Sequence, residues 1–465
     1  MQLAARGYAT AMQNPHHQDS RPDLQPFIDQ ARQDLADLVR LESVSAQGRM
    51  LAETAHHVGE LLQAEGFTVQ SYPGEVAPIL VAEAGEGPRT LLIYNHYDVQ
   101  PETPLELWDS PPFEATERDG RLYGRGISDD KGEFISRLAA VRALKAQHGG
   151  TLPLKIKWLL EGEEEIGSPS LSPFVHAHAE ELGADGCWWE FGSIDPQGRP
   201  VIYAGLKGII CLELRAKVSD SDLHSSLGAV VDNPLYKLSK AIASLRDETG
   251  KVTIDGFYDD VRAPSAADLD AVQRIPDESK AVQQAYGIKG FLQEVSGAGY
   301  YQRLVFEPCL NVNGFHGGYG EAGSKTVLPA EGFAKIDFRL VPDQTPERVL
   351  ELLKAHLAHH NLADIEVIEL ESHEHPARSD VAHPFVQLAL KVAAEVHGKE
   401  AVLHPSSAGS GPMHPFIEAI GLPVIAAGIG NHASRVHAPN ENIVIAHFEK
   451  GIEFGLKLMD ELARL

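Results

Sequence analysis

Four short clusters in the sequence contain histidine and acidic residues, whose side chains are of the types that can bind metal ions. The first cluster, NHYD at residues 95–98, directly follows the apolar run TLLIY. His96 and Asp98 are two positions apart, so both side chains point to one side if the extended geometry continues. A carboxylate beside a metal-binding histidine fixes the tautomer of the imidazole. The cluster is therefore a candidate ligand with its orienting partner, and a polar surface loop is the alternative.

The second cluster, YGRGISDDKG at residues 123–132, places Asp129 and Asp130 at the start of a predicted helix. Three glycines in ten residues indicate an irregular backbone. Helix N-termini favour carboxylates, so simple capping is one interpretation of the aspartate pair. The functional interpretation is a carboxylate that bridges two cations.

The third cluster is EGEEEIGS at residues 161–168, directly after the strand-like run LKIKWLL. Four carboxylates within five residues repel one another, which raises their pKa values unless a cation offsets the repulsion. Of the neighbours Glu164 and Glu165, one could then transfer a proton while the other binds a metal ion. A solvated acidic loop is the alternative.

The fourth cluster contains two histidines, His432 and His437, in the glycine- and asparagine-rich stretch GIGNHASRVHAPNEN at residues 428–442. Two further candidates stand outside the clusters. Glu190 follows a tryptophan pair, for which a core aromatic pair with an exposed glutamate is the alternative interpretation. His224 lies within residues 208–341, which are interpreted below as a separate inserted domain. It would therefore reach the other clusters only by domain closure or from a second subunit.

The charge count favours a centre of two metal ions. Asp129, Glu165, Glu190 and a hydroxide together carry about four negative charges, which balance two divalent cations, and two histidines complete the set. Two metals that share a carboxylate and a hydroxide supply a nucleophile at neutral pH. The sequence contains no HExxH metalloprotease helix, no G-x-S-x-G nucleophile elbow and no P-loop spacing.

The elements that must position these residues form an α/β pattern. The uncharged run at residues 90–94 predicts a strand buried on both faces, followed by a helix over 132–148 and a strand over 154–160. Residues 208–218 and 333–340 alternate like antiparallel strands. We therefore predict a catalytic α/β domain, with a mixed, largely parallel sheet flanked by helices, formed by residues 1–207 and 342–465. An α+β domain at 208–341 interrupts it.

Composition excludes several classes of protein. The chain has 465 residues and a formal net charge of −26, which opposes binding to a nucleic-acid backbone. No apolar run is long enough for a membrane helix, and the first 19 residues lack the apolar core of a signal peptide. Three cysteines cannot form a disulfide framework, so we expect a cytoplasmic protein. Residues 1–20 are polar and are expected to form a frayed arm.

The motifs HYDVQP, YGRGxxDDKG, EGxEExGS and HxPNE, in this order, resemble the dinuclear-metal amidohydrolase and peptidase family. This family includes carnosinase, cytosolic dipeptidases, glutamate carboxypeptidase, aminoacylase and succinyl-diaminopimelate desuccinylase, and the resemblance runs from about residue 25 to the end. It implies two divalent metal ions per subunit, zinc first and manganese or cobalt as alternatives. The ligands that it implies are His96, Asp129, Glu165, Glu190 and His437.

The resemblance also implies roles for neighbouring residues. Asp98 resembles the partner of the metal-binding histidine, and Glu164 the general base that activates the attacking water and passes its proton to the leaving amine. The bond between Asp129 and Asp130 is commonly a cis peptide in this family. His432 lies outside the motif and is expected to be incidental or to support the ligands from behind.

Residues 208–341 resemble the lid and dimerisation domain of the family, which implies a homodimer. His224 resembles the lid histidine that polarises the scissile carbonyl, and in dimeric members the partner subunit supplies it. Arg339 and Ser410 match positions that hold the carboxylate of the substrate. A structural salt bridge is the alternative for Arg339.

The resulting prediction is a metal-dependent hydrolase of small molecules, without a nucleic-acid or membrane partner. It would cleave an amide bond next to a free carboxylate, first as a dipeptidase or exopeptidase and alternatively as an N-acyl-amino-acid deacylase. Glu190 stands where dipeptidase-type members usually have aspartate, whereas HYDVQP and Trp108 resemble the dipeptidase branch. A relative that binds metal without catalysis is disfavoured, because Glu164 and all five ligands occur together. A metallophosphoesterase is disfavoured, because few basic residues lie near these clusters to bind a phosphate.

Overall fold

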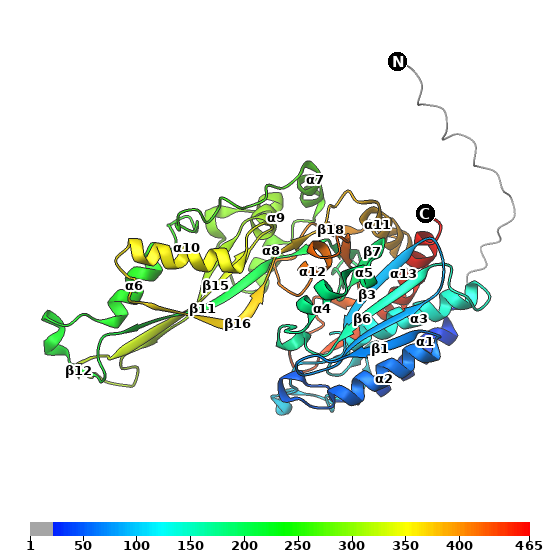
Figure 1. The fold of residues 1–465 in the computed structure, drawn as a ribbon, viewed down its shortest axis with the longest axis horizontal. Coiled ribbons are helices and arrows are strands. Elements are labelled where there is room, and N and C mark those ends of the chain that lie inside the picture. The colour runs from blue at the N-terminus through cyan, green and yellow to red at the C-terminus, as the bar shows by residue number, and fades with distance from the viewer. Residues whose placement is uncertain (1–21) are drawn as a thin grey trace, which may run out of the picture.

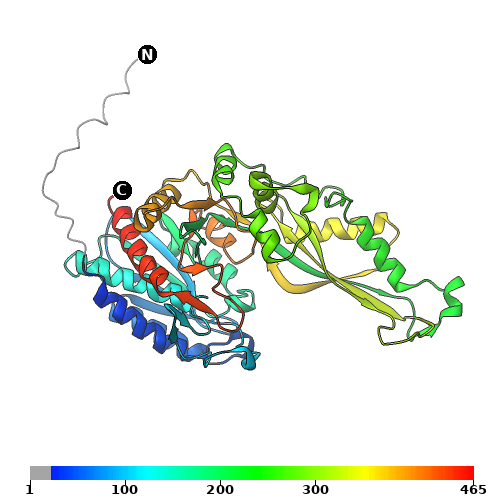
Figure 2. The same cartoon turned by 180° about the vertical axis from the view of Figure 1, so that it is seen from behind.

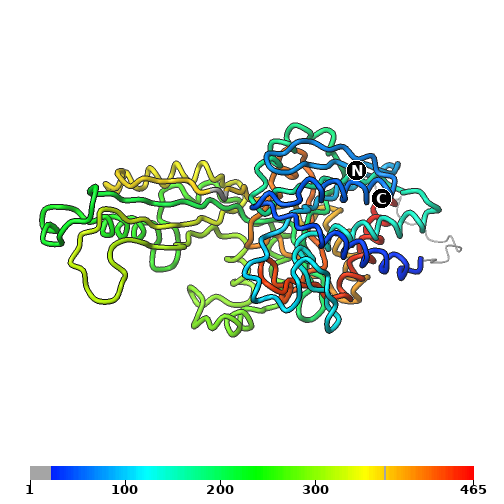
Figure 3. The backbone as a smooth tube through the Cα atoms, turned by 90° about the horizontal axis from the view of Figure 1, so that it is seen from below, coloured from blue at the N-terminus to red at the C-terminus, as the bar shows by residue number. Residues whose placement is uncertain are grey.

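The computed structural model describes residues 22–465, so the arm expected at residues 1–20 lies outside the described part. The chain forms a rounded first lobe and an elongated second lobe that extends to one side of it (Figures 1, 2 and 3). In Figure 1 the first lobe combines the blue start and the red end of the chain, while the second lobe is green and yellow. Segments from the beginning and the end of the chain therefore lie together in the first lobe, and the middle of the chain forms the second.

A mixed ten-stranded sheet forms the centre of the first lobe, in the order β1-β2-β6-β3-β7-β19-β9-β8-β20, with β18 beside β9. The central strands β6, β3, β7 and β19 run parallel to one another. The strands are β1 Thr68–Tyr72, β2 Ile79–Ala84, β3 Thr90–His96, β6 Lys155–Glu161, β7 Gly186–Trp189, β8 Ser193–Ile194, β9 Pro200–Tyr203, β18 Val402–His404, β19 Val424–Ala426 and β20 Gly430–Asn431. The predicted fold class is confirmed.

Both faces of this sheet are covered, which explains why β3 is apolar from Leu91 to Tyr94. Leu91 and Ile93 belong to one hydrophobic core, and Leu92 and Tyr94 belong to the core on the opposite face. Successive strand residues point to opposite faces, so a strand between two cores must be apolar at every position. The helices of the first core are α1 Gln25–Val39, α2 Leu51–Ala64, α3 Lys131–Gln147, α11 Pro384–His397 and α13 Ile445–Leu462, and those of the second are α4 Leu171–Ala177, α5 Ala179–Leu182 and α12 His414–Glu418.

The second lobe contains an antiparallel sheet in the order β13-β15-β11-β16. Its strands are β11 Gly208–Lys217, β13 Cys309–Gly317, β15 Glu331–Leu340 and β16 Glu366–Glu374. Helices α6 (Pro234–Ser244) and α10 (Pro346–His359) pack on this sheet in a separate hydrophobic core. Helices α7 (Ala266–Arg274) and α9 (Gly297–Phe306) instead contact β9 and β18 of the first lobe.

The predicted domain boundary between residues 341 and 342 does not match the end of this sheet. Strand β16 pairs with β11, and α10 contributes to the core of the second lobe, so the lobe continues to residue 374. The chain crosses between the lobes through β10 (Gly205–Leu206) and β17 (Ala377–Arg378), which pair with each other. Within residues 22–465, no helix is both long and apolar enough to cross a bilayer.

Candidate metal centre

Three neighbouring strands bring the acidic and histidine clusters to one edge of the sheet. His96 is the last residue of β3, Glu190 directly follows β7, and Glu164 and Glu165 lie in the short 3-10 helix η3 (Glu164–Ile166) beyond β6. Because β6, β3 and β7 are adjacent and parallel, their carboxyl ends meet at the same edge. This edge is where open α/β sheets carry functional groups.

The carboxylate of Asp129 stands between two histidines. Its Oδ1 lies 3.1 Å from His96 Nε2, and its Oδ2 lies 2.9 Å from His437 Nε2. His437 Nε2 is also 3.2 Å from Glu165 Oε2, and His96 Nε2 is 3.8 Å from Glu190 Oε2. All five residues predicted as ligands are therefore brought together, although His96 and His437 are more than 300 positions apart in the sequence.

Potential ligand atoms form two compact groups at this place. One group is His96, Asp130 and Glu190, and the other is Asp129, Glu165 and His437, with the ligand atoms of each group within 4.8 Å of one another. Among the residues that the structure describes, no hydrogen-bond partner contacts the buried atoms Asp130 Oδ1 and Glu190 Oε2. Buried carboxylate oxygens normally have such partners. Two groups with anionic oxygens left over fit a pair of divalent cations.

The electrostatics of the cluster support the same fit. Burial raises the pKa values of Glu164 and Glu190 well above the usual range. The charge of Glu165 raises the pKa of Glu164 further, and the charge of Glu164 raises that of Glu190. Hydrogen bonds to Asp129 and Glu165 raise the pKa of His437 to about 10. Although burial opposes it, hydrogen bonds to Asp129 and Asp98 raise the pKa of His96 well above its ordinary value. This is an excess of negative charge in a partly dry site, which bound cations would neutralise.

Asp98 orients several residues of the centre at once. The His96 Nδ1 atom lies 3.1 Å from the Asp98 backbone oxygen and 3.2 Å from its Oδ1, so the Nε2 atom faces Asp129. The Asp98 carboxylate also accepts the backbone N–H groups of Glu164 and Glu165, at 3.3 and 3.0 Å. One buried carboxylate therefore fixes the strand end and the following 3-10 helix together.

The four glutamates at the end of β6 have different hydrogen-bond partners and therefore different roles. Glu163 accepts the backbone N–H groups of Val76 and Ala77, at 2.6 and 2.8 Å. Glu161 accepts the hydroxyl groups of Tyr94 and Ser168, at 2.6 and 2.8 Å. These two glutamates are fully buried and stabilise the loop. Only Glu164 and Glu165 remain for the centre, and Gln100 Nε2 donates to Glu165 Oε2 at 2.9 Å.

The peptide bond between Asp129 and Asp130 is cis, as the family resemblance implied. The Asp130 carboxylate accepts the side-chain amide of Asn95 and the backbone N–H of His96. The Asp130 side chain thus contacts the end of β3, while the Asp129 side chain lies between the two histidines. The sequence named only Asp129 as a ligand, and Asp130 lies in the same cluster as His96 and Glu190.

Sequence reasoning missed Arg137, a fully buried guanidinium on α3. Its Nη1 donates to the carbonyl oxygen of Tyr94 at 2.9 Å and to that of Trp188 at 3.3 Å, and its Nη2 donates to Trp189 O at 2.9 Å. Arg137 therefore ties together the ends of β3 and β7, which carry His96 and Glu190. Its position offered a signal, because it lies three residues after Phe134 on the apolar stripe of the helix.

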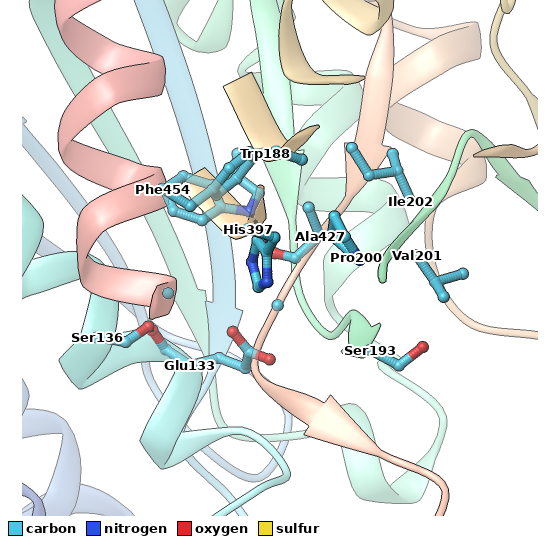
Figure 4. A pocket seen from close by; sticks show the side chains of 13 residues that line it. Glu133, Ser136, Trp188, Ser193, Pro200, Val201, Ile202, His397, Ala427 and Phe454 are labelled. Atoms are coloured by element: carbon cyan, nitrogen blue, oxygen red, sulfur yellow. Dashed lines mark hydrogen bonds between the residues drawn. The ribbon is translucent and has the colours of Figure 1, made fainter. Parts of the chain in front are cut away.

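A small cavity lies behind this edge, among α3, α11, α13 and the sheet. It encloses about 10 Å³, which is room for about one water molecule. Figure 4 shows the Glu133 carboxylate and the His397 ring beside this space, with Trp188 and Ala427 next to them. The cavity is too small for a peptide, so the substrate must approach the metal-binding edge from elsewhere.

The remaining predicted site residues lie in different places. Arg339, on β15, donates from Nη1 to Ser410 Oγ at 2.9 Å, so the second lobe and a loop of the first lobe meet there. His224 is exposed at the end of β12 (Leu223–His224), at the far tip of the second lobe (Figure 1), and its Nδ1 contacts Ser226 Oγ. A single chain therefore does not bring His224 to the metal-binding edge. His432 belongs to neither ligand group.

Comparison with known proteins identifies the class. The model of Peptidase family M20/M25/M40 matches residues 92–461, and the chain belongs to this family. It is a hydrolase of the metallopeptidase type, as the motifs indicated.

Three relatives each match more than four-fifths of the chain. A solved M20 family metallo-carboxypeptidase from Sulfolobus solfataricus is 37% identical, with a TM-score of 0.87, over 94% of this chain and 100% of that one. The human Beta-Ala-His dipeptidase is 27% identical over 94% of this chain and 91% of its own length. The Cys-Gly metallodipeptidase of Saccharomyces cerevisiae is 30% identical over 81% of this chain and 80% of its own. The predicted likeness to the dipeptidase branch is confirmed, and these relatives do not favour the N-acyl deacylase alternative.

Proposed function

We propose that this protein is a dinuclear-metal dipeptidase that hydrolyses the amide bond next to a free carboxylate. The observation that carries the proposal is the placement of Asp129, with one carboxylate oxygen toward His96 and the other toward His437. His96, Asp129 and Glu190 would hold one metal, and Asp129, Glu165 and His437 the other. Zinc suits this mixture of imidazole and carboxylate ligands, and manganese or cobalt would also fit.

When bound, two such cations would polarise the scissile carbonyl and lower the pKa of a water molecule between them. Glu164 is the general base in this proposal. Its carboxyl is held beside the ligands because Asp98 accepts the Glu164 backbone N–H. Glu164 would take a proton from the attacking water and return it to the leaving amine.

Arg339 and Ser410 would bind the free carboxylate of the substrate. The guanidinium of Arg339 is partly exposed and already donates to the Ser410 hydroxyl, so both can turn toward one anion. A planar guanidinium forms strong charge-assisted hydrogen bonds to a carboxylate. The relatives named Beta-Ala-His dipeptidase and Cys-Gly metallodipeptidase are named after dipeptides, which have a free carboxylate.

A homodimer would complete the site. His224 lies far from the ligands within one chain, so a second copy would have to supply it as the group that polarises the carbonyl. Strand β13 is an edge strand of the second lobe and is largely exposed, with Val312 and Phe315 turned to solvent. Exposed apolar edge strands are open to pairing with another strand. A cytoplasmic location is part of the proposal, because three cysteines provide no disulfide framework.

Metal analysis combined with a substrate panel tests the proposal. The purified protein is expected to hold two divalent ions per chain and to hydrolyse dipeptides such as Cys-Gly and β-Ala-His. Chelation should abolish turnover, and zinc or manganese should restore it. Turnover of N-acetyl and N-succinyl amino acids without any dipeptide hydrolysis would replace the dipeptidase by the deacylase.

A further inference from the structure

The side chain of Glu441 is fully buried and makes four hydrogen bonds to one loop. Its Oε1 accepts the backbone N–H groups of Ser128 at 2.9 Å and Asp129 at 3.0 Å. Its Oε2 accepts the backbone N–H of Gly126 at 3.0 Å and Nη1 of Arg125 at 2.8 Å. Both carboxylate oxygens therefore receive two donors each, all from residues 125–129.

This carboxylate joins the two segments that carry the central ligands. Glu441 follows His437 by four residues, and the loop that it binds ends at Asp129. The backbone N–H of Gly124 also donates to the Glu441 carbonyl oxygen at 3.0 Å. Directly beside these contacts, β21 (Asn442–Val444) pairs with β5 (Arg121–Tyr123). Glu441 thus links the segment that carries His437 to the loop that carries Asp129.

We propose that Glu441 is a positioning residue that holds Asp129 and His437 at the separation that two metal ions require. The inference rests on the dinuclear centre proposed above. A carboxylate is needed because all four partners are donors, and a side-chain amide would turn its own N–H groups toward two of them. An aspartate would keep the charge but is shorter by one methylene group, so it cannot reach all four donors.

The test compares Glu441→Gln with the wild type and with Asp185→Asn. Asp185 is the control, because it likewise accepts a backbone N–H (from Thr90) and a guanidinium (from Arg89), at a side chain that is 33% exposed. It lies at the opposite end of β3 from His96, away from the metal-binding edge. The measurements are zinc affinity by competition with a chromophoric chelator, the midpoint of urea unfolding of the metal-free protein, and kcat and KM with a dipeptide.

We expect Glu441→Gln to lower zinc affinity about 10–100-fold, the range seen when a residue that orients ligands is removed. Its kcat should fall with a smaller change in KM, because Arg339 and Ser410 still bind the substrate carboxylate. Asp185→Asn should keep the zinc affinity and the kinetic constants of the wild type. Glu441→Asp, which retains the charge, should lie between Glu441→Gln and the wild type, and it carries the test if Glu441→Gln does not fold.

Zinc affinity and kcat at the wild-type level in a folded Glu441 variant would overturn the inference, even if the unfolding midpoint fell. An equal loss of zinc affinity in Asp185→Asn would also overturn it, since the effect would then be general destabilisation. A wild-type protein that binds no metal would overturn the proposed function together with this inference. The two failures are therefore distinguishable.

Discussion

Replacing Arg137 with methionine is expected to destabilise the protein strongly and to disturb the metal-binding edge. The guanidinium donates to Tyr94 O, Asn95 Oδ1, Trp188 O and Trp189 O, at distances between 2.9 and 3.3 Å. Methionine has a similar length but no donor, so these oxygens lose their partner inside a dry core. The nearby Glu133 Oε2 lies 3.8 Å from the guanidinium and has no hydrogen-bond partner within residues 22–465, so its charge would lose its nearest cation.

The expected loss is about 3–5 kcal/mol of unfolding free energy, the range found when one member of a buried charged network is removed. Each orphaned acceptor alone costs about 1–3 kcal/mol, but neighbouring effects do not add. Arg32→Met is the control, because Arg32 forms an ion pair with Glu117 in which the side chains are 35% and 51% exposed. Such surface pairs contribute only about 0–1 kcal/mol.

Urea unfolding of the chelated proteins, followed by circular dichroism, measures both variants without the stabilisation that bound metal adds. We also expect weaker zinc binding by Arg137→Met, since the ends of β3 and β7 carry His96 and Glu190. A loss below about 1 kcal/mol, equal to that of Arg32→Met, would refute the reasoning that Arg137 ties the strand ends together.

Four further changes have definite expected outcomes. Glu164→Gln should lower kcat about 10²–10⁴-fold while two metals stay bound, as steady-state kinetics and metal analysis will show. Arg339→Met should raise KM for dipeptides about 10–100-fold and remove the preference over peptides with an amidated C-terminus. Gly428→Ala should lower the urea midpoint, costing about 1–3 kcal/mol, because the new Cβ would lie 1.9 Å from Glu133 Oε1. Burial lowers the pKa of His404 to about 4 in the folded protein. As the pH falls below 6.5, this histidine is protonated in the unfolded chain before it is protonated in the folded one, so the free energy of unfolding should fall between pH 6.5 and 4. His404→Phe should therefore lose less stability than the wild type between urea unfolding at pH 7.5 and at pH 5.

Each of these expectations has a contrary result. Glu164→Gln with unchanged kcat would remove the assigned proton transfer, and Arg339→Met with unchanged KM would make its contact with Ser410 structural. An unchanged urea midpoint in Gly428→Ala would mean that Glu133 can move aside. Identical acid sensitivity of His404→Phe and the wild type would show that His404 does not titrate with unfolding.

Local patterns in the sequence determined the elements and the chemistry of the site. The uncharged run before His96 predicted a strand between two cores, and the stripe of Phe134 and Leu138 predicted the helix that follows Asp129. These predictions succeed because burial on both faces of a strand, or on one stripe of a helix, constrains neighbouring residues directly. Motif order also supplied the five residues that meet at one edge of the sheet.

Only the tertiary structure decided what depends on pairing between distant segments. The strand-like sequence of β16 is compatible with either lobe, and its hydrogen bonds to β11 assign it to the second. Four glutamates in EGEEEIGS have similar local sequence. Two of them become structural because Val76, Ala77 and Tyr94 reach them from other parts of the chain, with Ser168 of the same loop as a further donor. The separation of Asp129 from His437 is set across 308 positions of the chain by contacts such as those of Glu441, which no local pattern encodes.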